Sequence, residues 1–227
     1  HPYVLLNYQG TLDHVFTLAH EMGHALHSYY SDSNQSYINA GYKIFVAEVA
    51  STCNESLLIH YLLKNTDNKA EKAYLINHFL EQFKGTLYRQ TMFAEFEKIT
   101  HKMVEEGETL TSDILCKVYY DLNKQYFGED MVLDEEIALE WARIPHFYNP
   151  FYVYQYATGI SAAIALSKKI MEQGEAGVKD YMKFLTGGGS KDPIDLLKLA
   201  GVDMTTKEPI EKALELFKEL LDQMEQS

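Results

Sequence analysis

Long apolar runs, cysteine and positive charge are all scarce in this sequence of 227 residues. No run of apolar residues is long enough to span a bilayer, and nothing resembles a secretory signal, so we expect no membrane association. The net charge of −13 disfavours nucleic acid as a partner, because an acidic surface repels phosphates. The two cysteines, Cys53 and Cys116, lie far apart and outside any C-x-x-C pattern. This predicts reduced core thiols in a cytoplasmic protein rather than a disulfide scaffold or a zinc knuckle.

The size and composition are those of an ordinary globular protein, with 46% hydrophobic and 23% charged residues. The length allows one large domain or two small ones. We find no internal repeat and no low-complexity linker, so we expect residues 1–227 to form a single domain. The chain begins at His1 rather than at a methionine, and we therefore expect it to be a piece of a longer protein. Its oligomeric state is not indicated.

A metal-binding motif, H-E-x-x-H, lies within residues 17–27, T-L-A-H-E-M-G-H-A-L-H. Residues four apart share one face of a helix, so His20 and His24 can direct their ring nitrogens to one ion. Glu21 is offset by one residue and can reach a water on that ion as a general base. The alternative is a helix that carries these polar residues by chance. Its apolar flanks argue against that alternative, because buried histidines and glutamates need partners.

A third ligand is predicted in the helical stretch 43–64. Glu48 lies among apolar neighbours in F-V-A-E-V-A, where a carboxylate needs a cation, and a zinc ion would supply one. The alternative is a surface carboxylate. His27 is a rival ligand, one turn beyond the motif, but the two-turn metzincin pattern needs Gly and His at positions 27 and 30, and the chain has His27 and Tyr30. We therefore expect one Zn²⁺ per chain, with His27 as a packing or substrate-side residue.

Glu55 lies seven residues after Glu48, on the same helix face. We hypothesise that its carboxylate accepts the far N–H of His20 or His24, as carboxylates do beside metal-bound histidines. The alternative is a solvated helix charge.

A second informative stretch, residues 143–159, combines two prolines and a histidine with closely spaced tyrosines. Tyr152 and Tyr156 are separated by one helical turn, and His146 precedes them. Phenol and imidazole donors can stabilise the oxyanion that peptide hydrolysis creates. The alternative is aromatic packing with hydroxyls on the surface.

The remaining pattern predicts a helical chain, with Thr11 or Asp13 capping the motif helix. The expected elements are an extended segment at 1–10, a helix to about 30, a loop at 31–36, helices at 43–64 and 69–106 (broken near Gly85), helices over 110–127 and from 134, helices at 160–173 and 178–185, a flexible glycine segment at 186–190, and helices after Asp192 and over 206–224.

Three stretches together resemble the oligoendopeptidase F and thimet oligopeptidase family of zinc peptidases. They are F-T-L-A-H-E-M-G-H-A-L-H-S at 16–28, F-V-A-E-V-A-S-T-C-N-E at 45–55, and I-P-H-F-Y-N-P-F-Y-V-Y-Q-Y-A-T-G-I-S-A at 144–162, followed by the glycine-rich segment to 204. The resemblance covers the whole chain but only the C-terminal part of the family's usual length. It implies an all-α, multi-helix zincin-type catalytic domain built around the H-E-x-x-H helix.

The resemblance also implies an activity, zinc-dependent cleavage of short peptides, and a role for each matched residue. The zinc ligands would be His20, His24 and Glu48, and Glu21 would be general base and proton shuttle. His146 would stabilise the transition state. We favour Tyr152 and Tyr156 as oxyanion donors, with Tyr154 in reserve. Two other functions stay open: a zinc-binding fragment without turnover, because the upstream half of the channel is missing, and a hydrolase acting on a non-peptide bond.

Overall fold

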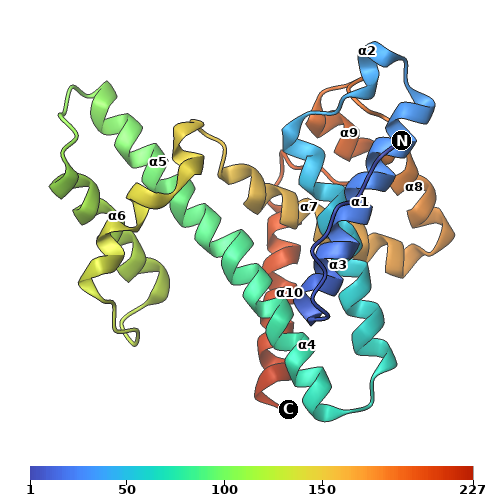
Figure 1. Ribbon diagram of the computed structural model, residues 1–227, viewed down its shortest axis with the longest axis horizontal. Helices are drawn as coiled ribbons and strands as arrows, with labels where there is room; N and C mark the ends of the chain where they lie inside the picture. The colour runs from blue at the N-terminus through green and yellow to red at the C-terminus, as the bar shows by residue number, and fades with distance from the viewer. Residues whose placement is uncertain (227) are drawn as a thin grey trace. The chain divides into compact units, whose positions relative to one another are not determined.

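The computed structural model describes residues 1–226 and is built of helices, with no strand in that range (Figure 1). This confirms the all-α prediction. The segment expected to be extended, residues 1–10, has no regular secondary structure. The chain divides into two compact units. The first comprises His1–Phe83 and the chain from Thr158 onward, and the second is Lys84–Ala157. A single domain over 1–227 stays a prediction.

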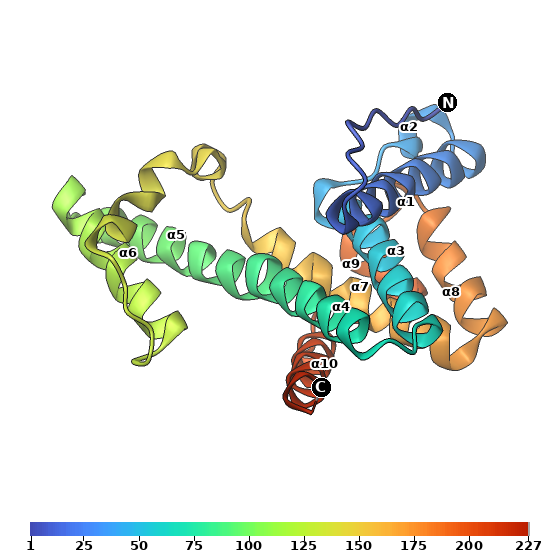
Figure 2. The ribbon, with the colours of Figure 1, turned by 60° about the horizontal axis from the view of Figure 1, so that its bottom comes forward.

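The first unit contains most of the helices. They are α1 (Leu12–Asn34), α2 (Tyr37–Ala40), α3 (Ile44–Asn65), α4 (Lys69–Gln82), α8 (Glu175–Leu185), α9 (Pro193–Leu199) and α10 (Glu208–Glu225), together with most of α7 (Tyr154–Gln173). Helix α1 packs on α3, and the two are neighbours in both orientations of the ribbon (Figure 2). None of the helices over residues 1–226 is long and apolar enough to cross a membrane.

Side-chain hydrogen bonds to the backbone stabilise both ends of helix α1. Thr11 is its N-cap, and the hydroxyl accepts from the His14 N–H. The loop predicted at 31–36 begins later, at residue 35, because the helix continues to Asn34. Its last turn contains Ser33 and Asn34, whose side chains donate to the carbonyls of Tyr29 and Tyr30. Polar side chains such as these often compete with the backbone and favour a loop. Here they instead donate to carbonyls of the preceding turn, so the helix continues.

The core of the first unit forms between α3, α7, α8 and α9. Its buried members are Val46, Val49, Ala50, Cys53, Ala162, Ala163, Leu166, Phe184, Leu185, Leu196, Leu197, Ala200 and Val202. Because one face of α3 is anchored in this core, the position of that helix under α1 is fixed.

The glycine segment after α8 is packed, contrary to the flexible loop expected from its sequence. Gly187 and Gly188 are buried, and Gly188 has φ +53. The Gly189 N–H donates to the Asn39 carbonyl at 2.7 Å. A Cβ at Gly188 would lie 2.3 Å from that same oxygen, so the glycines allow a close backbone approach rather than motion.

The second unit holds α5 (Arg89–Glu105), α6 (Ser112–Phe127), the 3₁₀ helices η2 (Glu135–Arg143) and η3 (Pro145–Tyr148), and all but the first residue of η1 (Phe83–Tyr88, a π-helix). The break expected near Gly85 is the π-helix, which leads from α4 into α5. The helix expected from residue 134 is of the 3₁₀ type. The helix predicted at 160–173 begins earlier, at Tyr154, and that at 178–185 begins at Glu175. Buried side chains form the core of this unit: Met92, Phe93, Phe96, Tyr119, Leu122, Ile144 and Val153.

Candidate metal centre

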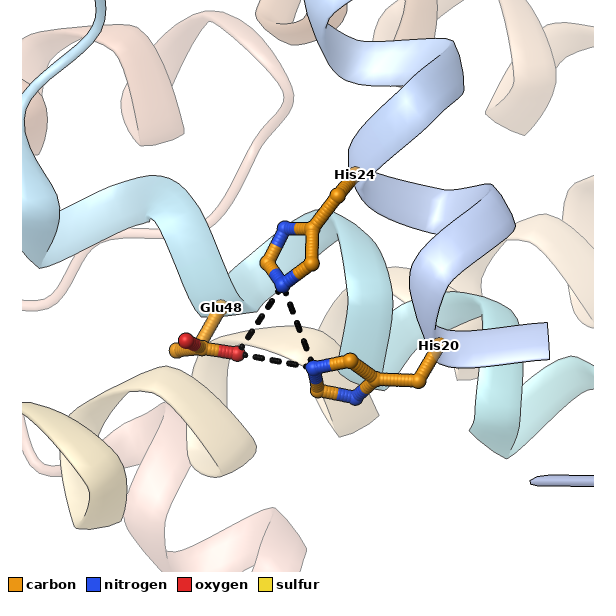
Figure 3. A group of neighbouring side chains, drawn as sticks. All are labelled: His20, His24 and Glu48. Carbon is orange, nitrogen blue, oxygen red and sulfur yellow. Dashed lines mark hydrogen bonds and ion pairs between the residues drawn. The ribbon is translucent and has the colours of Figure 1, made fainter. Parts of the chain in front are cut away.

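Three ligand-type side chains from two helices converge in the first unit (Figure 3). His20 and His24 lie one turn apart on α1, and Glu48 reaches them from α3. The two Nε2 atoms are 3.1 Å apart, and Oε2 of Glu48 is 3.1 Å from His20 Nε2 and 3.4 Å from His24 Nε2. Ligand atoms placed tetrahedrally around zinc at bond lengths near 2.1 Å are roughly 3.4 Å apart. Two imidazoles and a carboxylate therefore fit a zinc ion in both chemistry and spacing.

A glycine inside the motif permits this convergence. Gly23 is buried where α1 crosses α3, and a Cβ there would lie 2.5 Å from Ser51 Cα. No other residue type fits at that distance, because the neighbouring atom belongs to backbone. Asn54 also links the two helices, donating from Nδ2 to the Ala19 carbonyl at 2.5 Å. The close crossing brings Glu48 within reach of both histidines.

The far side of the His20 ring is held by Glu55. Nδ1 of His20 lies 2.5 Å from Oε1 of Glu55, while its Nε2 faces Glu48. The other Glu55 oxygen accepts from Gln82 Nε2 at 2.6 Å. This is the contact expected for Glu55. It directs Nδ1 to Glu55, so that Nε2 is the ring nitrogen turned towards Glu48 and His24.

The charges of these groups depend on one another. Burial lowers the pKa of His20, but hydrogen bonds to Glu48 and Glu55 outweigh burial and raise it to about 10. Hydrogen bonds with His20 and His24 hold the pKa of Glu48 well below its usual range. These opposite shifts favour an imidazolium–carboxylate pair, and a cation held by the same atoms would displace the proton.

The rival ligand His27 is placed as a packing residue. Its side chain is buried and stacks on the Tyr42 ring with centroids 3.7 Å apart, with Phe184 at 5.0 Å. Among residues 1–226, the one His, Cys, Asp and Glu group with metal-ligand spacing is His20, His24 and Glu48. His27 therefore lies outside the candidate ligand set.

Glu21 is half-buried on α1, between the two motif histidines in sequence, and is not part of that ligand group. Its role as a general base rather than a ligand stays a prediction.

In the second unit, the structure brings together the expected donors His146, Tyr152 and Tyr156. The Tyr156 hydroxyl lies 3.4 Å from His146 Nε2 and 3.4 Å from the Tyr152 hydroxyl. The three rings are mutually 5.6–5.9 Å apart between centroids. Tyr154, the reserve candidate, begins α7, and the residue is 42% exposed. We call His146, Tyr152 and Tyr156 the donor cluster.

The spacing of the two tyrosines comes from a turn as well as a helix. Tyr152 precedes α7, which begins at Tyr154. The Tyr152 N–H donates to the Asn149 carbonyl at 3.2 Å, closing a four-residue turn. Phe151, the third residue of this turn, has φ 58. It is the only non-glycine residue with positive φ among residues 1–226, a conformation that costs about 1–3 kcal/mol.

Several residues that shape these sites carry no signal of that role in the sequence alone, or only a weak one. Gly23 and Asn54 act through the helix crossing, and Gln82 acts through Glu55. The turn at Phe151 had a usable signal, since Asn149-Pro150 is a turn-forming dipeptide. Gln82 had none, because its partner lies on another helix.

Comparison with known proteins gives one family. The sequence profile of Peptidase family M3 matches residues 1–216. The "Oligopeptidase PepF" of Bacillus subtilis (strain 168) is 56% identical over 225 residues, covering 99% of this chain and 34% of its own length. The chromosomal "Oligoendopeptidase F" of Lactococcus lactis subsp. cremoris is 45% identical over 223 residues, covering 98% of this chain and 37% of its own length.

Solved structures give the same picture. Oligoendopeptidase-F from Enterococcus faecium is 46% identical, with a TM-score of 0.85 over 95% of this chain and 39% of that one. A putative peptidase from Chlamydophila abortus is also 46% identical, with a TM-score of 0.90 over 99% of this chain and 38% of that one. The chain thus spans between a third and two fifths of the length of these relatives.

Proposed function

Because the chain belongs to peptidase family M3, we propose that it is the catalytic part of a zinc-dependent endopeptidase that hydrolyses short oligopeptides. One observation carries this proposal above the others. Two imidazole nitrogens and a carboxylate oxygen converge with separations of 3.1–3.4 Å, and a second carboxylate, Glu55, orients one of the imidazoles. Such a set is typical of hydrolytic zinc sites.

His20, His24 and Glu48 would hold one zinc ion per chain. Such an ion supplies Lewis-acid chemistry, polarising a carbonyl oxygen and making water acidic enough to lose a proton near neutral pH. Glu21 then acts as general base: its carboxylate takes a proton from the attacking water and passes it to the leaving amine. Glu55 keeps the His20 ring in its ligand orientation throughout.

The donor cluster is proposed to act on the tetrahedral oxyanion. Tyr152 and Tyr156 donate from their hydroxyls, and His146 donates from its ring or orients the Tyr156 hydroxyl. Donors that are held in place before the reaction lower the barrier without reorganising during it. Their clustering within the second unit supports this role.

The proposed substrates are short peptides, in line with the names "Oligopeptidase PepF" and "Oligoendopeptidase F" given to the relatives. No nucleic acid partner is proposed, given the net charge of −13. A cytoplasmic location stays a prediction from the cysteine content.

Cleavage of a short internally quenched peptide tests the proposal. We expect the zinc-loaded chain to cleave it, and Glu21→Gln to keep the zinc while losing turnover by at least about a hundredfold, since it removes the base. Glu215→Gln, which changes an exposed carboxylate of α10, is the matched control and should match the parent. Activity of Glu21→Gln equal to the parent's would contradict the mechanism.

A second candidate is a zinc-binding piece without useful turnover. The observation that favours it is coverage, since the chain spans 34% of the Bacillus subtilis relative. In that case the parent would bind zinc stoichiometrically and leave the quenched peptide intact, whereas cleavage excludes this candidate.

A further inference from the structure

Glu97 makes an unusual contact within the second unit. Its side chain on α5 is buried, with the residue 5% exposed. Oε1 accepts the backbone N–H of Phe151 at 2.6 Å, across 54 positions of sequence. A buried carboxylate is costly unless a strong donor meets it, so this bond ties α5 firmly to the turn that precedes Tyr152.

The turn needs such an acceptor because of its backbone conformation. It runs from Asn149 to Tyr152, with Pro150 second and Phe151, at φ 58, third. A proline at the second position and a positive φ at the third are typical of a type II turn, in which the third residue is usually glycine. A phenylalanine there favours the type I turn, where φ is roughly −90° and the central peptide is turned over by roughly 180°. That rotation would take the Phe151 N–H away from Glu97.

The flanks of the turn are anchored on both sides. Ile144 before it and Val153 after it belong to the buried core of the unit, at 8% and 0% exposed. The Phe151 ring rests near the His101 ring on α5, with centroids 4.7 Å apart. Tyr152 directly follows Phe151, and its own N–H closes the turn. A change in the backbone conformation of the turn therefore alters the direction in which the Tyr152 side chain leaves the chain.

We propose that Glu97 is a positioning residue: its carboxylate holds the Asn149–Tyr152 turn in the positive-φ form and thereby places the Tyr152 hydroxyl within the donor cluster. Glu97 acts through the backbone of Phe151 rather than on the substrate. Its effect on catalysis rests on the proposed function, in which the donor cluster acts on the oxyanion. Its effect on geometry does not.

The geometric claim is tested without turnover, by NMR of the full 227-residue chain with labelled tyrosine and phenylalanine. We expect ring–ring contacts between Tyr152 and Tyr156, and a Phe151 amide protected from exchange. Both signals should disappear in Glu97→Ala and remain in Glu97→Gln, whose carbonyl oxygen still accepts the N–H. Glu105→Ala, an exposed carboxylate on the same helix, is the matched control. Persistence of both signals in Glu97→Ala would overturn the proposal.

Two further variants distinguish loss of the Glu97 hydrogen bond from a general folding defect in Glu97→Ala. Glu97→Met keeps the side-chain length without an acceptor and should lose the same signals. Adding Phe151→Gly to Glu97→Ala removes the Cβ that disfavours positive φ, and should restore part of the Tyr152–Tyr156 proximity. A double variant no better than Glu97→Ala would contradict the role assigned to the turn.

The effect of Glu97 on catalysis is measured as kcat and KM for peptide cleavage, with the same proteins, each loaded with zinc. We expect Glu97→Ala to lower kcat about tenfold or more with little change in KM, because the affected donors act in the transition state. Glu97→Gln should stay near the parent, and zinc content should be equal in all. A parent that binds zinc but never cleaves peptide would count against the proposed function alone, since the NMR result still decides the positioning role. If the Tyr152 and Tyr156 rings separate in Glu97→Ala while kcat stays equal to the parent's, Tyr152 has no part in catalysis.

Discussion

Glu55 holds the His20 ring from the side opposite to Glu48: Oε1 lies 2.5 Å from Nδ1, while Nε2 of the same ring lies 3.1 Å from Glu48 Oε2. One carboxylate, Glu55, thus orients the imidazole from Nδ1, and the other, Glu48, lies against Nε2 of the same ring. Both come from α3, seven residues apart. Helix α3 therefore carries both a proposed zinc ligand, Glu48, and the carboxylate that orients another proposed ligand, His20.

Replacing Glu55 is expected to weaken zinc binding without removing a ligand. Glu55→Gln loses the charge that stabilises the Nδ1-protonated tautomer, so zinc affinity should fall about 10–100-fold. Competition with a chromogenic chelator measures this affinity. Glu215→Gln on α10 is the control for loss of one negative charge. Unchanged affinity in Glu55→Gln would remove Glu55 from the zinc site.

Gly23 is expected to tolerate no side chain. In Gly23→Ala the new Cβ would lie 2.5 Å from Ser51 Cα, so α1 and α3 must separate. We expect a loss of about 1–3 kcal/mol in the free energy of unfolding, as for overpacked cores, together with weaker zinc binding. Chemical denaturation and the chelator assay measure the two effects. Gly41→Ala is the control, because a Cβ there meets nothing within 4 Å.

The buried carboxylate of Glu140 predicts sensitivity of the second unit to acid. Burial raises its pKa, but hydrogen bonds from Tyr119 and Arg89 outweigh burial and hold the pKa below the usual value. A carboxyl whose pKa is lower in the folded state stabilises that state above its unfolded pKa, near 4.3. This stabilisation is lost as the pH falls through the folded value.

Thermal unfolding of the parent and of Glu140→Gln at several pH values tests this. The Tyr119 hydroxyl donates to Glu140 Oε2 at 2.7 Å, and Arg89 and Arg143 both pair with Oε1. At pH 7 the variant should be less stable by about 1.5–3 kcal/mol, the range for hydrogen bonds to a charged group. The difference in stability between the parent and Glu140→Gln should become smaller towards pH 3. A difference in stability that stayed constant with pH would contradict an ionised Glu140 in the folded protein.

The two cysteines are expected to differ in reactivity. Cys53 is 0% exposed, and burial raises the pKa of its thiol to about 12 despite a hydrogen bond with Tyr181. Cys116 is half-buried on α6. Since the thiolate is the reactive form, a thiol reagent should label Cys116 in the native protein and both residues after unfolding. Rapid native labelling of Cys53 would contradict its place in the core.

The sequence predicts best what depends on local spacing. The motif helix, its Thr11 cap and the approach of Glu48 and Glu55 follow from helical periodicity and from the need of a carboxylate for a partner among apolar neighbours. The break near Gly85 is also predictable, although its π-helical form is not.

What the sequence does not predict depends on residues distant in the chain. The glycines at 187–189 have the composition of a flexible loop, but the reason for them, a close approach to Asn39, lies on another helix. Tyr152 and Tyr156 have the spacing of one helical turn, whereas a turn held by Glu97 brings them together. In both cases the deciding interaction is tertiary, and no local pattern encodes it.

Zinc content per chain, measured in the purified parent and in Glu48→Ala, decides whether the proposed metal site exists. We predict about one zinc per parent chain and clear loss in the variant, because removing a carboxylate leaves two of the three proposed protein ligands. Glu215→Ala should retain the parent's zinc. Full retention of zinc in Glu48→Ala, or no zinc in the parent even after reconstitution, would contradict the assignment of His20, His24 and Glu48 as the ligands.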